Sequence, residues 1–179
     1  MKNIVVNIVL FQIGWFACVL TAASNQPSVG AIISLFIIVM HLFIFKQYQQ
    51  EIRIIVIAMI IGLLWDSLIV AAGWITYTSG MLNDYLAPYW IVLMWALFAT
   101  TLNHSLSWMK EKLLLAAVFG AVAGPLAYYA GMKLGAVDFT NETNALVALS
   151  IGWAVFTPLL LKISSKKAGY KKYLDGELL

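Results

Sequence analysis

The sequence has few charged residues and only one cysteine. Asp, Glu, Lys and Arg make up 11% of the 179 residues, whereas about 25% is ordinary for a soluble domain. Hydrophobic residues make up 63%, and the mean hydropathy is +0.90. A soluble chain of this length has too little interior to bury so much apolar surface. With Cys18 as its only cysteine, the chain can form neither an intramolecular disulfide nor a site built from several thiolates.

Catalytic and nucleotide-binding signatures are also missing. The chain contains no H-E-x-x-H, no G-x-S-x-G and no glycine-rich phosphate loop. His41 and His104 could approach each other. The third ligand considered, Asp66, is expected at a different depth in the membrane, and a catalytic metal site usually needs at least three close protein ligands. We therefore predict no metal site and no cofactor. The one basic cluster, 162–172, follows an apolar segment, which argues against nucleic-acid binding.

What the chain does contain is long apolar segments. A membrane-spanning helix needs about 20 such residues, and no segment shows the sustained two-residue alternation of a strand. We therefore predict an all-α integral membrane protein whose residues 1–163 form a six-transmembrane-helix bundle, followed by a basic tail at 164–179. The predicted spans are 3–23, 29–45, 53–76, 88–108, 113–132 and 144–161. Aromatic residues near their ends, among them Tyr77 and Trp90, are interpreted as interfacial anchors.

The positions of the basic residues predict how the chain is threaded. Except for Lys133, every Lys and Arg lies before the first span, beside the second or fourth gap, or after the sixth span. Because basic segments resist translocation, this pattern places both termini in the cytoplasm.

Asp66 is the only carboxylate deep within a predicted span. A charged Asp at the membrane centre costs about 3 kcal/mol to insert, so its side chain is expected to face the other helices. Ala58, Gly62 and Gly73 share its stripe, which supports that direction, because small residues let helices approach closely. A purely structural interhelical hydrogen bond and a place in a polar binding site are both compatible with this position.

A second group of polar residues lies in the fourth span. Thr100 and Thr101 are expected as the first neighbours of Asp66, with Asn103 and His104 nearer the cytoplasmic end, about 10 Å away in depth. A direct contact between Asp66 and His104 is therefore not expected. The candidate polar core is Asp66, Ser67, Thr100, Thr101, Asn103, His104 and Tyr128.

The fifth span carries a small-residue motif and a proline. Gly120 and Gly124 are four residues apart and are expected to pack within one bundle. Gly124 and Pro125 predict a kink at the depth of Asp66, because proline frees the Ala121 carbonyl. Water, Asp66 or Tyr128 could then supply its partner.

Four short motifs resemble those of a known family of small bacterial inner-membrane proteins, classed only as a domain of unknown function. The resemblance covers nearly the whole chain and implies a bacterial inner-membrane location, with genes near those for membrane-lipid modification, but no established activity. The motifs, in this order, are Gly62-Leu63-Leu64-Trp65-Asp66-Ser67, Ala87-Pro88-Tyr89-Trp90, Ala99-Thr100-Thr101-Leu102-Asn103-His104-Ser105-Leu106 and Gly124-Pro125-Leu126-Ala127-Tyr128.

Three functions remain open from the sequence. The first is binding or transport of a lipid or small amphipathic molecule in a polar cavity around Asp66 and the Thr100–Ser107 face. The second is an intramembrane lipid-modifying enzyme, with His104 as acid and base and Asp66 or Asn103 orienting the substrate. The third is a non-catalytic subunit of another membrane protein. Expected partners are the lipid bilayer, a lipid or small-molecule ligand, or a membrane protein.

Overall fold

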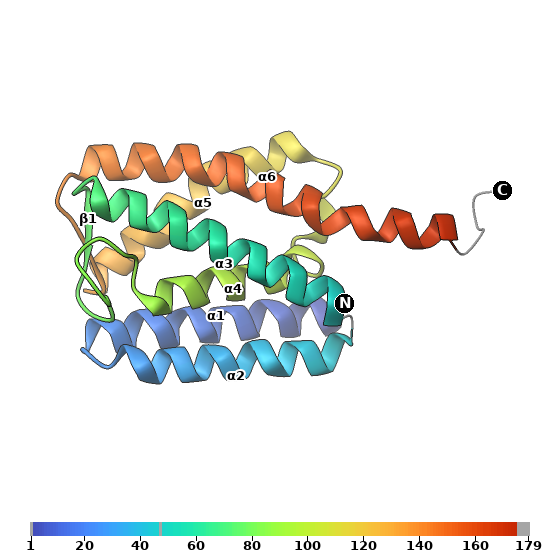
Figure 1. Cartoon of the computed structure of the whole chain (residues 1–179), viewed down its shortest axis with the longest axis horizontal. Coiled ribbons are helices and arrows are strands. Elements are labelled where there is room, and N and C mark those ends of the chain that lie inside the picture. Colours follow the sequence, from blue (N-terminus) through green and yellow to red (C-terminus); the bar gives the residue numbers. More distant parts are fainter. Residues whose placement is uncertain (1, 47, 175–179) are drawn as a thin grey trace.

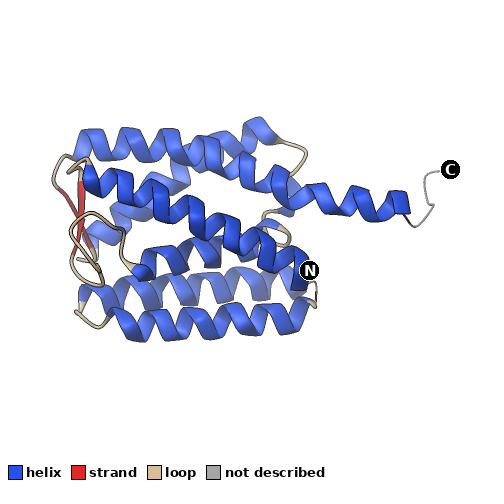
Figure 2. Cartoon of the chain, in the orientation of Figure 1, coloured by secondary structure: helices blue, strands red, loops and turns tan. Residues whose placement is uncertain are grey.

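The chain folds into a bundle of helices with a small two-stranded sheet at one end. The structure is a computed structural model that describes residues 2–46 and 48–174, and within these ranges there are six α-helices (Figures 1 and 2). Successive helices run in opposite directions, so α1 begins and α6 ends at the end of the bundle away from the sheet (Figure 1). The helices are α1 (Lys2–Ala23), α2 (Pro27–Phe45), α3 (Tyr48–Ala71), α4 (Tyr89–Leu102), α5 (Leu113–Lys133) and α6 (Glu142–Leu174).

Five of these helices, all except α4, are long and apolar enough to cross a membrane. Their outward faces carry large apolar side chains, such as Leu114 at 81% exposed and Ile32 at 68%. In contrast, Asp66 and Glu51 are completely buried. Large apolar side chains on the outside and two buried carboxylates within the bundle reverse the pattern of a water-soluble protein, so this mainly helical fold suits a bilayer.

Helix α4 is shorter than the predicted span 88–108. Its 14 residues extend about 21 Å, less than the roughly 30 Å of a hydrocarbon core. After Leu102 the chain turns and forms a short 3₁₀ helix, Ser107–Met109. Thr100, Thr101 and Ser107 each donate a side-chain hydrogen bond to a carbonyl three residues earlier. Such local bonds offer the backbone an alternative to a regular helix.

Helix α4 is also the most enclosed helix. It packs against α1, α2, α3 and α6, and Ile91, Ala96 and Leu97, which point in three different directions around the helix, are at most 1% exposed. A helix that is apolar all round is stable only in such surroundings. Helix α5 instead packs along α6 and crosses the bundle obliquely (Figure 1).

The expectation that the chain has no strands was wrong. Strand β1 (Ile75–Tyr77) pairs antiparallel with β2 (Val137–Phe139), and Thr76 lies opposite Asp138. The strands belong to the connections that follow α3 and α5, beyond the helix ends (Figure 2). Three residues are too few to produce the alternation by which a strand is recognised in a sequence.

Small residues pack within the bundle as predicted, with one exception. A Cβ atom at Gly120 would overlap the carbonyl oxygen of Trp153 on α6, and one at Gly62 would overlap the Trp95 ring on α4. Gly73 was assigned to the same stripe as Gly62, but it lies beyond α3, has φ +70° and has open space beside it. Its backbone conformation, which favours glycine, ends the helix.

Candidate functional site

Asp66 joins three helices and the sheet through its carboxylate. The Trp95 indole of α4 donates to Oδ2 at 2.7 Å, and the hydroxyls of Tyr77 on β1 and Tyr128 on α5 donate to Oδ1 at 3.1 and 2.5 Å. The side chain is completely buried. The prediction that Asp66 faces the other helices is confirmed, and a carboxylate with three donors is well suited to hold these elements in place.

The expected neighbours of Asp66 were wrong. Thr100 and Thr101 bond to carbonyls of their own helix, while Trp95 and Tyr77 take the expected place. Trp95 is an uncharged aromatic residue one helical turn before Ala99, the first residue of the third motif. In the sequence, only its indole N–H indicated that it could donate a hydrogen bond. Tyr77 has the position of an interfacial anchor in the sequence, but it is 7% exposed because β1 directs it into the bundle.

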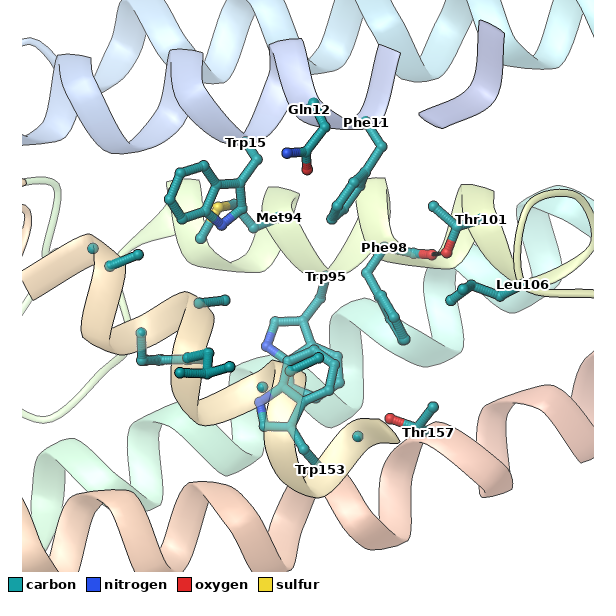
Figure 3. Close-up of a pocket in the computed structure, with 18 of the residues that line it drawn as sticks. Phe11, Gln12, Trp15, Met94, Trp95, Phe98, Thr101, Leu106, Trp153 and Thr157 are labelled. Carbon is teal, nitrogen blue, oxygen red and sulfur yellow. Dashed lines mark hydrogen bonds between the residues drawn. The ribbon is translucent and has the colours of Figure 1, made fainter. Parts of the chain in front are cut away.

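A cavity of about 700 Å³ lies beside this cluster, bounded by α1, α4, α5 and α6. Ligand-binding pockets commonly have volumes of about 300–1,000 Å³. Figure 3 shows Phe11, Gln12 and Trp15 of α1 extending toward it from one side, with Trp95 and Trp153 stacked on the other. Their ring centroids are 4.5 Å apart and their planes are nearly parallel. Helix α5, which crosses the bundle obliquely (Figure 1), lines the cavity with residues from Phe119 to Gly131.

The cavity is elongated along the helices. On α1 its lining extends from Ile8 to Val19, and on α4 from Trp90 to Thr101. At 1.5 Å per residue, each range corresponds to about 16 Å. Phe119 and Leu126 of α5 also line the cavity, and both are exposed on the outer surface, so it opens sideways beside α5.

Several polar groups at the cavity lack a protein partner. The Gln12 amide makes no side-chain hydrogen bond within the described ranges, although it lies in the middle of α1 and extends into the cavity (Figure 3). The Nε1 of Trp153 and the Oγ1 of Thr157, two more lining residues, are buried without a partner among the same residues. An unpaired polar group in an apolar environment is costly, so the Gln12 amide favours an occupant with a polar atom. The Trp153 and Thr157 atoms are too deeply buried for an occupant of the cavity to reach.

Asp66 itself does not line the cavity, but its partners Trp95 and Tyr128 do. The carboxylate therefore fixes part of the wall from behind. Gly124 also lines the cavity and lies against the Trp153 ring. Helix α5 continues through the buried Pro125 to Lys133. The Tyr128 hydroxyl was one suggested partner for the Ala121 carbonyl, but it donates to Asp66 instead.

A second polar cluster lies between α2, the start of α3 and the turn after α4. Nε2 of His41 is 3.3 Å from Glu51 Oε2, and Nε2 of His104 is 3.2 Å from Glu51 Oε1. The expected approach of the two histidines is confirmed, with ring centroids 5.0 Å apart. The sequence pointed to Asp66 as the carboxylate to consider with these histidines. Their actual partner is Glu51, which is completely buried in the first turn of α3.

Asn103 and Lys110 extend this cluster. The Asn103 amide donates to Glu51 Oε1 at 3.0 Å, and its own oxygen accepts from Lys110 Nζ at 2.6 Å. Partial burial lowers the pKa of the Lys110 ammonium, while the Glu51 carboxylate acts in the opposite direction. The structure thus separates Asn103 and His104 from Asp66, with no hydrogen-bond partner shared between the two groups in the described part of the chain.

The remaining predicted site residues have different roles. Ser67 accepts a hydrogen bond from the Ala87 amide and so anchors the connection before α4. The Thr100 carbonyl accepts from the Asn7 side chain of α1. Thr101 and Tyr128 are the two residues of the predicted polar core that line the cavity. The single core expected from the sequence is therefore two clusters and a cavity.

Comparison with known proteins identifies a family but no activity. No curated protein and no solved structure matches the chain. Residues 4–159 match the family described as "Protein of unknown function (DUF2878)". This match covers most of the chain, so the resemblance to a family classed as a domain of unknown function is confirmed. The chain belongs to this family of proteins of unknown function.

Proposed function

We propose that this protein crosses the bacterial inner membrane six times, with both termini in the cytoplasm, and binds a lipid-like amphipathic molecule in the cavity between α1, α4, α5 and α6. The observation that carries the binding proposal is the elongated, mostly apolar cavity with the unpartnered Gln12 amide on its wall. Transport of the bound molecule would use the same cavity.

The alternating helix directions support the proposed threading. Helix α1 begins and α6 ends at one end of the bundle (Figure 1), and the positions of the basic residues assign that end to the cytoplasm. Helix α4 is short for a span, but the turn after Leu102 is bonded to the rest of the bundle. Asn103 and His104 contact Glu51, and the Ser105 amide donates to Asn7, as irregular backbone at membrane depth requires protein partners.

Reporter fusions test this threading. Green fluorescent protein fused after Leu179 is expected to fluoresce, and alkaline phosphatase at the same place is expected to be inactive, because it folds only outside the cytoplasm. Phosphatase inserted after Asn83, in the connection before α4, is expected to be active. The opposite pattern would contradict the proposed orientation.

The shape of the cavity favours an acyl or isoprenyl chain. A channel about 16 Å long along the helices accommodates an extended chain better than a compact solute. Its sideways opening beside α5 would admit such a molecule directly from the bilayer. The Gln12 amide offers hydrogen bonds to a polar group of such a molecule, and a few polar groups in an otherwise apolar pocket are typical of ligand sites.

Filling the cavity tests the binding proposal. Ala123 and Ala127 line it from α5, so Ala123→Phe and Ala127→Phe place a ring in the space for the ligand. We expect native mass spectrometry of gently extracted wild-type protein to show a retained lipid-like molecule. Each variant should retain it at least about tenfold less, since overpacking costs about 1–3 kcal/mol.

Val122→Phe is the matched control. It adds the same ring to the same helix, but Val122 is 55% exposed and does not line the cavity, so retention should stay at the wild-type level. A wild-type protein that retains no such molecule, or equal retention by all variants, would contradict the proposal. The enzyme hypothesis receives less support, because His104 belongs to the other cluster and does not line the cavity.

A further inference from the structure

Three side chains from separate parts of the chain meet at the end of the bundle away from the sheet. They are His41 near the end of α2, Glu51 in the first turn of α3, and His104 in the turn after α4. We propose that they bind one divalent transition-metal ion of the zinc type, through two imidazole nitrogens and the carboxylate. This site is separate from the lipid cavity, and the proposal does not depend on the function proposed above.

The distances between the ligand atoms suit a shared ion. One nitrogen or oxygen atom from each residue can be chosen so that all three lie within 4.8 Å of one another. At metal–ligand distances of about 2.0–2.1 Å, neighbouring ligands of a tetrahedral zinc ion are about 3.4 Å apart. The nitrogen–oxygen distances here are 3.2 and 3.3 Å, whereas charged hydrogen bonds are usually about 2.7–2.9 Å.

The charge of the cluster also favours a cation. Glu51 is completely buried, and within the described ranges no Lys or Arg lies within salt-bridge distance of it. The Lys110 ammonium bonds to Asn103, whose amide donates to Glu51. An unpaired buried carboxylate is unfavourable. A divalent ion held by the two imidazoles and the carboxylate would compensate this charge.

The surrounding residues already hold the ligands in position. The Phe45 ring packs on both imidazoles, with centroids 4.6 Å from His41 and 3.8 Å from His104. Asn103 donates to Glu51 Oε1 and fixes the carboxylate. Orientation of ligands by neighbouring groups strengthens metal binding. His41 and Glu51 are almost completely buried, whereas His104 is 13% exposed, so an ion would reach the site beside His104.

The ligand set indicates the kind of metal. Two imidazoles with one carboxylate suit zinc or iron(II), whereas magnesium and calcium prefer oxygen ligands. Three protein ligands leave at least one coordination position for water or another molecule, which is the arrangement of catalytic rather than purely structural zinc sites. The Lys110 ammonium opposes a second positive charge nearby, so removing it should strengthen metal binding.

Calorimetry with Zn²⁺ tests the site. The protein must be purified without a polyhistidine tag and stripped with a chelator, because His41 and His104 are its only histidines. We expect one Zn²⁺ per chain and a higher thermal unfolding temperature with the ion. Glu51→Gln and His104→Gln should each weaken binding at least about 100-fold, since even loss of an outer partner costs 10–100-fold.

Glu111→Gln is the control. It removes an exposed carboxylate from the connection between α4 and α5 and leaves the three ligands unchanged. The Zn²⁺ affinity of this variant should equal that of the wild type. X-ray absorption at the zinc edge of wild-type protein decides the case even where the variants fail to fold. A shell of nitrogen and oxygen with two imidazoles supports the site. Absence of Zn²⁺ binding, or a shell without two imidazoles, overturns the proposal, as would undiminished binding by folded Glu51→Gln and His104→Gln.

Discussion

Asp66→Leu is expected to lower the free energy of unfolding by roughly 3 kcal/mol or more. It leaves the buried donors of Trp95, Tyr77 and Tyr128 without an acceptor, and each such donor costs about 1–3 kcal/mol. The lower end of that range applies in lipid, where the unfolded chain also finds partners. Because total stability is commonly about 5–15 kcal/mol, the loss should be visible as a large drop in the thermal unfolding temperature in detergent.

Two further variants separate the charge of Asp66 from its hydrogen bonds. In Asp66→Asn the amide oxygen can accept from Trp95, while the tyrosine hydroxyls can turn to accept from the amide nitrogen, so most of the stability should remain. Tyr128→Phe removes a single bond and should cost about 1 kcal/mol. Equal stability of Asp66→Leu and the wild type would show that the carboxylate does not hold the bundle together.

Gly120→Leu is expected to destabilise the protein by about 2–3 kcal/mol. The new Cβ would overlap the Trp153 carbonyl oxygen, and backbone cannot move aside as the end of a flexible side chain can. Leucine favours a helix over glycine by about 1 kcal/mol. If helix propensity alone decided the outcome, Gly120→Leu would therefore stabilise the protein. Thermal unfolding and the elution volume in size-exclusion chromatography would report the separation of α5 from α6.

Val118→Leu provides the comparison for Gly120→Leu. Val118 lies on the same helix and is 55% exposed, so a leucine there meets no other helix. Its unfolding temperature should equal that of the wild type. If both variants behaved alike, the close packing of α5 on α6 would be contradicted.

The general architecture could be predicted from the sequence because it depends on local composition. Each long apolar segment became a helix within about five residues of its predicted bounds, except the fourth and the sixth. Helix α6 continues to Leu174, beyond the predicted end at 161 and into the predicted basic tail. The fourth helix is shorter than predicted. There, Thr100, Thr101 and Ser107 bond to nearby carbonyls, and the helix ends at Leu102. Hydropathy is the same whether a helix continues or ends, so it does not show where side-chain bonds to nearby carbonyls interrupt the helix.

Glu51 shows why the second cluster could not be found from the sequence. It lies among Gln49, Gln50 and Arg53 in a segment typical of a solvated connection between spans. The structure begins α3 at Tyr48, which turns Glu51 toward His41 and His104. A glutamate between two spans and a histidine 53 positions away become neighbours only through the arrangement of α2, α3 and α4.

The sequence by itself determined that this chain is an apolar, helical protein, that Asp66 faces inward, and to which family it belongs. These properties follow from composition, periodicity and short motifs, which are local. Only the tertiary structure decided which side chains meet: Trp95, Tyr77 and Tyr128 at Asp66, the two histidines at Glu51, and the cavity beside α5. Such contacts depend on which helices are neighbours and at what angle they cross, and packing over the whole chain sets both.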